Sequence, residues 1–315
     1  MARPLVQQAC TSRSPAAYPV IVFSLLVMTL ACDRPAPPPA ATASLSVIDD
    51  SGRTVELTAP AASIVSLIPS MTDVILSLGA ADRLVARTRY DTDRRLVSLP
   101  SLEDALTPSI EWLVSRNPDL VIAWPDRQSR TVVTRLVELG IPTYASTIET
   151  LDDMRRGIRN VGVLLALDAA ADSLVAALDS AIASVHTAVA DRETLDVLYL
   201  VGLEPPVSVG PGSFVHELIG VAGGRNVLDD ASTSWPPVSV EEIVARDPDV
   251  VLVAVALPEA EVLRRLRETP GLRRLEAVRQ DRVRVLDPSL FNRPGPALIE
   301  AVRVLASAIH PGAFR

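Results

Sequence analysis

The chain has 315 residues and a formal net charge of −8, with 30 basic against 38 acidic side chains. Every basic residue is an arginine, so a phosphate-loop lysine, a lysine Schiff base and a lysine general base are all excluded. The acidic balance also makes the chain a poor candidate for binding nucleic acid.

The first 31 residues are typical of an export signal. Arginines precede an apolar run over residues 20–31, which is too short to span a bilayer core of about 30 Å. Ala31 stands directly before Cys32, as a small residue does before the acylated cysteine of bacterial lipoproteins, which this segment resembles. We therefore predict a signal peptide at 1–31, lipidation at Cys32 and anchoring to a membrane in the periplasm or at the cell surface. An ordinary secreted protein with a chance cysteine is the alternative.

Residues 32–44 are rich in proline and alanine and form a tether with nothing to bury. After them, residues 45–150 alternate short apolar strands with helices, the pattern of a mainly parallel sheet. Glycines close the expected helices. The predicted elements are a hairpin of strands 45–50 and 53–58, strands at 64–68, 84–86, 120–123 and 143–145, a turn at 69–70, and helices at 71–78 and 128–139.

Residues 151–190 contain no proline and few glycines, and they indicate one or two helices, the last spanning 168–190. Strands are then expected at 195–201, 250–255 and 283–286, and helices at 213–222 and 296–309. We predict an α/β fold of two lobes, 45–150 and 195–315, with mainly parallel central sheets and a core in each lobe. A long rigid helix joins them within a connector at 151–194.

One stretch of the sequence occurs twice. SIEWLVSRNPDLVIA begins at Ser109, and SVEEIVARDPDVVLV begins at Ser239, 130 residues later. In each copy a proline, Pro118 or Pro248, keeps the residue before it out of helical space and so ends the helix ahead of a strand. A repeated unit at this spacing indicates two similar lobes with a ligand cleft between them. A chance match between two common helix–strand junctions is the alternative.

Catalytic groups are scarce. The three histidines lie far apart, without metal-ligand spacing, and the chain has no G-x-S-x-G motif. The glycine-rich segment before Ser213 could hold an anion at a helix N-terminus, but it is more typical of a tight turn with Ser213 as the helix cap. We therefore predict no catalytic residues, no metal ligands and no enzymatic activity.

The aromatic residues are few and lie in informative places. Tyr90, Trp124 and Phe291 follow predicted strands, and Trp235 lies in a loop of the second half. Loops at the carboxyl ends of parallel strands are where α/β sheets bind ligands, so these four side chains predict a stacking surface for a large flat or apolar ligand. Alternatively, each of them caps the core of its own lobe.

At this point the chain resembles the substrate-binding proteins of bacterial ABC importers for cobalamin, haem and iron-siderophores, the class with a helical backbone. The resemblance runs from about residue 45 to the C-terminus. Within that class, Tyr90, Trp124, Trp235 and Arg293, the last three with their neighbours in the chain, most resemble the cobalamin binders. The matching segments are residues 64–79, 117–124, 139–142, 206–218, 222–227, 237–248 and 292–296.

The resemblance implies a corrinoid held edge-on in the cleft as the transported ligand, with no cofactor of the protein's own. Tyr90, Trp124, Trp235, Phe291 and Arg293 are then the expected ligand-binding residues. It further implies delivery to a permease and ATPase complex. In such complexes, an acidic residue on each lobe meets arginines of the permease.

Asp73 matches the first of these docking positions. The second falls at Gly220, with Glu217 one helical turn away as its substitute.

Four alternative functions compete with this one. A haem binder would need an axial ligand, for which Tyr90 is available, and a ferric-siderophore binder would need several cations, for which Arg87, Arg89 and Arg293 are available. A sensor lobe without an importer is also compatible with the sequence. An exported α/β enzyme would need a nucleophile–base pair, which the sequence does not offer.

Overall fold

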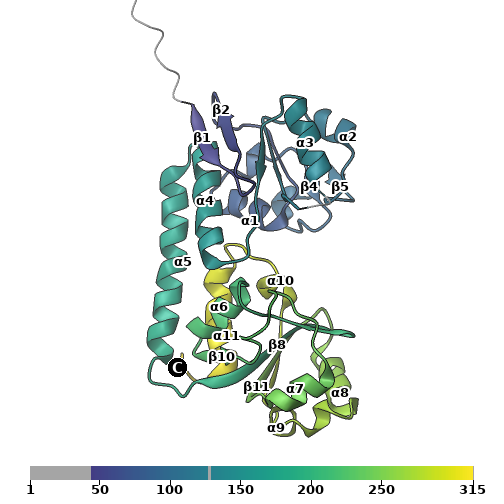
Figure 1. The fold of residues 1–315 in the computed structure, drawn as a ribbon. Coiled ribbons are helices and arrows are strands. Elements are labelled where there is room, and N and C mark those ends of the chain that lie inside the picture. Colours follow the sequence, from purple (N-terminus) through teal and green to yellow (C-terminus); the bar gives the residue numbers. More distant parts are fainter. Residues whose placement is uncertain (1–43, 127–128, 315) are drawn as a thin grey trace, which may run out of the picture. The chain divides into compact units, whose positions relative to one another are not determined.

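The computed structural model describes residues 44–126 and 129–314, which belong to one compact unit. The predicted signal peptide, the tether up to residue 43 and Cys32 lie outside the described residues. The predicted α/β fold with mainly parallel sheets is confirmed (Figure 1). Among the described helices, none combines the length and the apolar character that crossing a membrane requires.

The first half is built on a parallel sheet of three strands in the order β3-β6-β7. The antiparallel hairpin predicted around Ser51-Gly52 is present as β1 and β2. The elements are β1 Leu45–Ile48, β2 Thr54–Leu57, β3 Ile64–Ser66, α1 Pro69–Ser77, η1 Ala81–Arg83, β4 Arg87–Thr88, η2 Arg94–Leu96, β5 Ser101–Leu102, α2 Ile110–Val114, β6 Leu120–Ala123, α3 Arg130–Glu138 and β7 Thr143–Ala145.

Two local predictions in this half are wrong. Pro69 and Ser70 do not form a separate turn but the first turn of α1, because proline is well tolerated at the first position of a helix, where its missing N–H is not needed. The strand predicted at 84–86 is reduced to a single bridge between Leu84 and Ile64, and β4 begins only at Arg87.

The second half carries a parallel sheet in the order β10-β8-β11-β12, with β9 antiparallel to β8. Its elements are β8 Leu195–Leu203, β9 Pro206–Ser208, α6 Phe214–Val221, β10 Gly224–Asn226, α7 Val240–Arg246, β11 Val250–Ala254, α8 Glu259–Glu268, η3 Leu272–Arg274, α9 Glu276–Arg279, β12 Val283–Leu286, α10 Pro288–Phe291 and α11 Leu298–Ile309.

The repeated unit has the same construction in both halves. Ser109 and Ser239 cap α2 and α7, because each hydroxyl accepts a hydrogen bond from the backbone N–H three residues on. The residues before the two prolines, Asn117 and Asp247, adopt left-handed backbone conformations with φ of 49° and 41°. Asn and Asp tolerate this region best. Helix α7 ends directly before Asp247, as the sequence predicted, whereas α2 ends earlier, at Val114.

The aspartate that follows each proline makes an equivalent hydrogen bond in both halves. Asp119 Oδ2 accepts from the Ser63 N–H at 3.0 Å, just before β3, and Asp249 Oδ2 accepts from the Asp196 N–H at 2.9 Å, at the start of β8. Each carboxylate thus fixes the neighbouring strand of its sheet. A chance match between unrelated junctions would not reproduce this contact. The two copies are therefore the same helix–strand unit, placed in the same way in both sheets.

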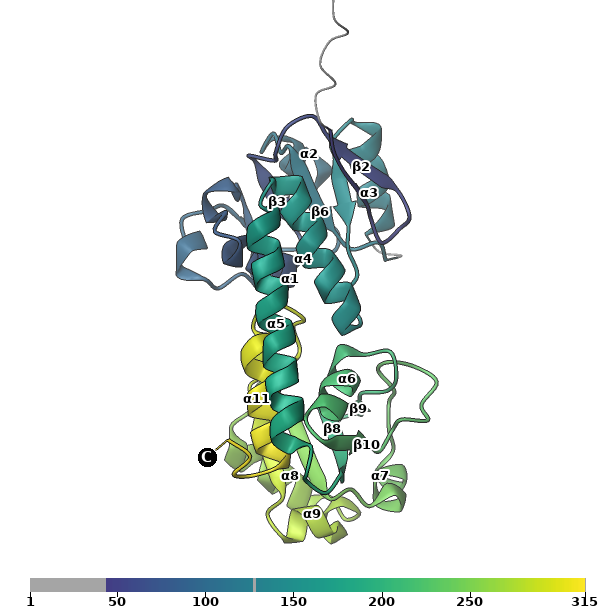
Figure 2. The same ribbon diagram turned by 90° about the vertical axis from the view of Figure 1, so that its left-hand side faces the viewer.

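Two helices, α4 Leu151–Leu165 and α5 Asp168–Val189, correspond to the predicted connector. A capping box of Thr150 and Asp153 starts α4, and α5 continues for 22 residues without a break. Figures 1 and 2 both show α5 alongside α4 and, further along, alongside α11 of the second half.

The predicted core of each lobe is present, and a further apolar cluster is shared by both halves. Each sheet has a core of its own on one face, packed under α2 and α3 in the first half and under α7, α8 and α9 in the second. On the other faces a single cluster runs from β1, α1 and α4 through α5 to α6 and α11. Because interiors are close-packed, this shared core resists bending between the two sheets.

Candidate functional site

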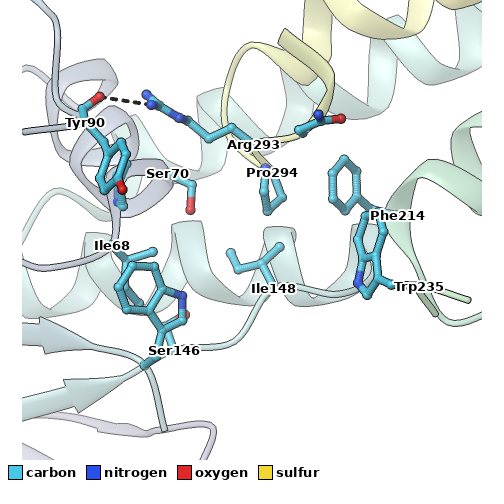
Figure 3. A pocket seen from close by; sticks show the side chains of 12 residues that line it. Ile68, Ser70, Tyr90, Ser146, Ile148, Phe214, Trp235, Arg293 and Pro294 are labelled. Atoms are coloured by element: carbon cyan, nitrogen blue, oxygen red, sulfur yellow. Dashed lines mark hydrogen bonds between the residues drawn. The ribbon is translucent and has the colours of Figure 1, made fainter. Parts of the chain in front are cut away.

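A pocket of about 420 Å³ lies between the two sheets, and both halves of the chain contribute to its walls (Figure 3). Its volume is within the range of small-molecule sites, about 300–1,000 Å³. Most of the lining is apolar or aromatic. The lining residues are Ile68, Pro69, Ser70, Tyr90, Trp124, Ser146, Ile148, Phe214, Trp235, Asn292, Arg293 and Pro294.

The first half supplies residues that follow the carboxyl ends of its parallel strands. Trp124 comes directly after β6, Ser146 directly after β7, and Pro69 opens the helix that follows β3. Parallel strands end at one edge of a sheet, so these side chains gather there. Tyr90 joins them from the loop after β4 and is 49% exposed.

The second half contributes an aromatic pair. The rings of Phe214 and Trp235 lie edge to face, with centroids 6.4 Å apart and planes at 62°. Trp235 is 41% exposed in this structure, and Phe214 is buried behind it. The exposed indole and the ring behind it form the aromatic wall of the pocket on this half.

Four of the five predicted ligand-binding residues line this pocket, namely Tyr90, Trp124, Trp235 and Arg293. Phe291 does not: its side chain is fully buried in the shared core, where α10 packs against α11. Its place is taken by Phe214, which the sequence analysis missed. The signal was present, because the predicted cap at Ser213 makes Phe214 the first residue of a helix.

Among the described lining residues, the only charged side chain is Arg293, and its charge is compensated. Nη1 lies 3.4 Å from Asp73 Oδ2, and Nη2 donates to the backbone oxygen of Tyr90 at 2.9 Å. Burial is the main reason why the pKa of the Asp73 carboxyl lies above its usual range, with Arg293 acting in the opposite direction.

Three neutral polar groups also face the pocket region. Asn292 is held by its own half, since its amide donates to the Ala254 carbonyl at 3.0 Å. Ser146 also lines the pocket, and its hydroxyl oxygen is buried without a hydrogen-bond partner in this structure. Ser70, in the first turn of α1, is the third.

Tyr90 has a cation beside its phenol. Arg89 donates from Nη2 to the Tyr90 hydroxyl at 2.6 Å, and its guanidinium carbon lies 4.8 Å from the ring centroid. Neither Arg89 nor Arg87 lines the pocket. The three arginines that a siderophore would use therefore do not converge, and only Arg293 reaches the pocket.

The two predicted docking residues are both engaged within the chain. Asp73 was expected on the surface that faces the permease, and in this structure it pairs with Arg293 at the side of the pocket. Glu217 accepts from the backbone N–H of Leu151 at 2.8 Å, so its carboxylate holds the start of α4. Gly220 is exposed, and a side chain there would meet open space.

Residues 44–126 and 129–314 contain no group of three or more His, Cys, Asp or Glu side chains arranged to hold a metal ion. In the part of the chain that the structure describes, Ser213 serves as the cap of α6, as the sequence predicted, with its hydroxyl accepting from the His216 N–H at 3.2 Å. His216 Nδ1 lies 3.1 Å from the Asn226 amide.

Known proteins of related sequence are binding proteins. The vitamin B12-binding protein of Vibrio cholerae is 26% identical over 245 residues, which are 77% of this chain and 87% of that protein. An ABC transporter substrate-binding lipoprotein of Bacillus subtilis, itself uncharacterized, is 27% identical over 278 residues, 86% of this chain and 87% of that one.

Solved structures with the same fold are of the same kind. The periplasmic vitamin B12-binding protein of Vibrio cholerae matches with a TM-score of 0.69 and 26% identity, covering 79% of this chain and 97% of that one. A periplasmic haem-binding protein of Roseiflexus matches with a TM-score of 0.68 and 28% identity, covering 78% and 98%. A model of the periplasmic binding protein family matches residues 64–290, most of the chain, and the protein is therefore a member of that family.

Proposed function

We propose that this binding protein captures cobalamin or a related corrinoid and delivers it to an ABC importer. The observation that carries the proposal is the aromatic pocket between the two sheets, with Trp124 and Tyr90 from one half and Trp235 from the other. A wide, flat macrocycle that enters by its edge can contact both walls at once. Relatives named as vitamin B12-binding proteins support the choice of ligand.

The polar groups of the pocket suit a corrinoid as well. A corrin ring carries amide side chains around its edge, and these are neutral donors and acceptors. Ser70, Ser146 and Asn292 are neutral too, and the charge of Arg293 is already paired with Asp73. A neutral rim favours amides over the carboxylates or the ferric complexes that free cations would attract.

Haem is the second candidate, because of one specific contact. Tyr90 lines the pocket, its hydroxyl accepts a hydrogen bond from Arg89 at 2.6 Å, and a tyrosine oxygen can serve as an axial ligand of haem iron. The haem-binding relative from Roseiflexus is compatible with this alternative. Ferric siderophores find less support, since Arg293 is the only arginine among the described lining residues.

Titration separates these ligands. We expect the protein without residues 1–31 to bind cyanocobalamin one to one in calorimetry, and to bind a ferric hydroxamate weakly or not at all. Hemin tests the second candidate through its absorbance: a tyrosinate-type spectrum that is lost in Tyr90→Phe would identify haem as the ligand. A protein that binds hemin tightly and cyanocobalamin not at all contradicts the corrinoid proposal.

We also propose that Cys32 carries a lipid that holds the protein at the membrane beside its importer. A relative named as a lipoprotein supports this. When the chain is expressed with its own leader in a bacterium fed a clickable fatty acid, the wild type should be labelled and fractionate with membranes. The Cys32→Ser variant should lose the label, and equal labelling of both proteins would refute lipidation at this cysteine.

Docking to the permease through Asp73, with Glu217 as the substitute at the second position, stays part of the proposal. Both carboxylates now have an internal partner, so a permease arginine would compete with Arg293 at Asp73 and with the Leu151 N–H at Glu217. Ion pairs in an interface that excludes water can be strong enough to offset the loss of these internal contacts.

A further inference from the structure

A short turn of the second half contacts the first half on the pocket side of the molecule. Residues 293–296, with sequence Arg-Pro-Gly-Pro, follow α10 in the second half and lie against the first turn of α1. A Cβ atom built on Gly295 would lie 3.8 Å from Ser70 and 3.8 Å from Asp73 Oδ2. This turn is therefore in contact with the opposite half, away from the connector helices.

Arg293 makes this contact a bonded one. Its guanidinium bridges two separate elements of the first half. Nη1 lies 3.4 Å from the Asp73 carboxylate on α1. Nη2 donates to the Tyr90 carbonyl in the loop after β4 (Figure 3). The bridged residues are 220 and 203 positions away in the sequence. The side chain thus spans from one sheet's loops to the other's.

The turn holds Arg293 in place because its backbone is restricted and because it is hydrogen-bonded to the rest of the second half. Pro294 and Pro296 fix their own φ angles, and a residue before proline, such as Arg293, is restricted to extended conformations. Asn292 ties the other end to the second half, through the Ala254 carbonyl at 3.0 Å and the Tyr199 hydroxyl at 3.3 Å. Movement of Arg293 relative to the second half is therefore small.

The ion pair itself is only partly exposed. The side chain of Arg293 is 28% exposed and that of Asp73 is 36% exposed. Asp91 and Asp93 also lie near enough to Asp73 to disfavour its charge, and Arg293 acts against them, with Arg95 a further cation near Asp73. Removing either partner leaves the charge of the other without its ion-pair partner at the edge of the pocket.

We propose that Asp73, Arg293 and the Tyr90 carbonyl form a clamp that fixes the separation of the two halves at the pocket, so that Asp73 positions the ligand site through Arg293 without lining the pocket. The proposal rests on the proposed function only for its ligand. Arg293, Pro294 and Tyr90 line the pocket themselves, so a clamp that opens would move two of its walls apart.

Distances in the ligand-free protein test the clamp directly. A form that starts at residue 33 has no cysteine, because the two in the sequence precede it. Spin labels at Val97→Cys and Val244→Cys, both exposed and in opposite halves, report the separation. We expect one narrow distance with the clamp intact, and a broader or longer distribution in Asp73→Asn and in Arg293→Gln, with no further change in the double variant. Unchanged distributions would overturn the proposal.

Ligand affinity is the second measurement, with cyanocobalamin and hemin as probes. Asp73→Asn should weaken binding of the probe that the wild type binds by about threefold or more, and the effects of the two substitutions should not add. Asp82→Asn, an exposed aspartate on the same half, is the charge-matched control and should leave affinity unchanged. Altered distances with unaltered affinity would refute the positioning role of Asp73. If the wild type binds neither probe, the proposed ligand fails, and the distances still decide whether the clamp exists.

Discussion

Replacing Trp124 or Trp235 with alanine should weaken ligand binding about tenfold or more, and replacing both should reduce it to the limit of detection. Burying one aromatic side chain against a ligand stabilises the complex by about 1.5–3 kcal/mol. The two rings belong to opposite walls of the pocket, so the losses should add when the ligand contacts both. Isothermal titration calorimetry with the ligand identified for the wild type measures both effects.

Trp112 provides the matched control. It lies on α2, outside the pocket, with the Arg116 guanidinium 4.9 Å from its ring centroid. Trp112→Ala removes an indole of the same size and should leave the dissociation constant unchanged. Wild-type affinity in both pocket variants would show that the ligand binds elsewhere. Equal losses in all three variants would indicate a general effect on folding.

The second large effect concerns stability rather than binding. Phe291→Ala should lower the free energy of unfolding by about 3–5 kcal/mol, because it opens a cavity in the core that both halves share. Urea denaturation followed by circular dichroism measures the change. Phe314→Ala removes a ring that is 40% exposed and should change stability little.

Phe291 was predicted as a ligand contact, so this variant also decides between two roles. Under conditions where the variant is folded, it should still bind the ligand with nearly the affinity of the wild type. A variant of normal stability that has lost ligand binding would restore the original prediction.

The sequence predicted the fold through patterns that are local. Each copy of the repeated unit is fifteen residues long and contains its own serine cap and its own proline. The structure has the same arrangement in both halves. The rule that ligand residues follow strands led to Trp124 and Tyr90, which both line the pocket. It failed at Phe291, since the rule gives the position along the chain but not the direction of the side chain.

Contacts between distant parts of the chain were beyond such rules. Nothing near Asp73 in the sequence indicates that Arg293 lies beside it, and nothing near Glu217 points to the N-terminus of α4. Both carboxylates were therefore assigned to permease docking without knowledge of their partners within the chain. Their partners depend on how the two sheets are placed, which in turn depends on the packing of α4, α5 and α11.

The shared core around α5 also limits how the chain can be divided. The apolar face of this one helix is covered at one end by α4 and at the other by α11. A fragment that contained only one of the two repeated units would expose part of that apolar face to water, and exposed apolar surface promotes aggregation. The duplication visible in the sequence therefore does not make either half a detachable module, and fusions or split reporters based on this protein must keep both.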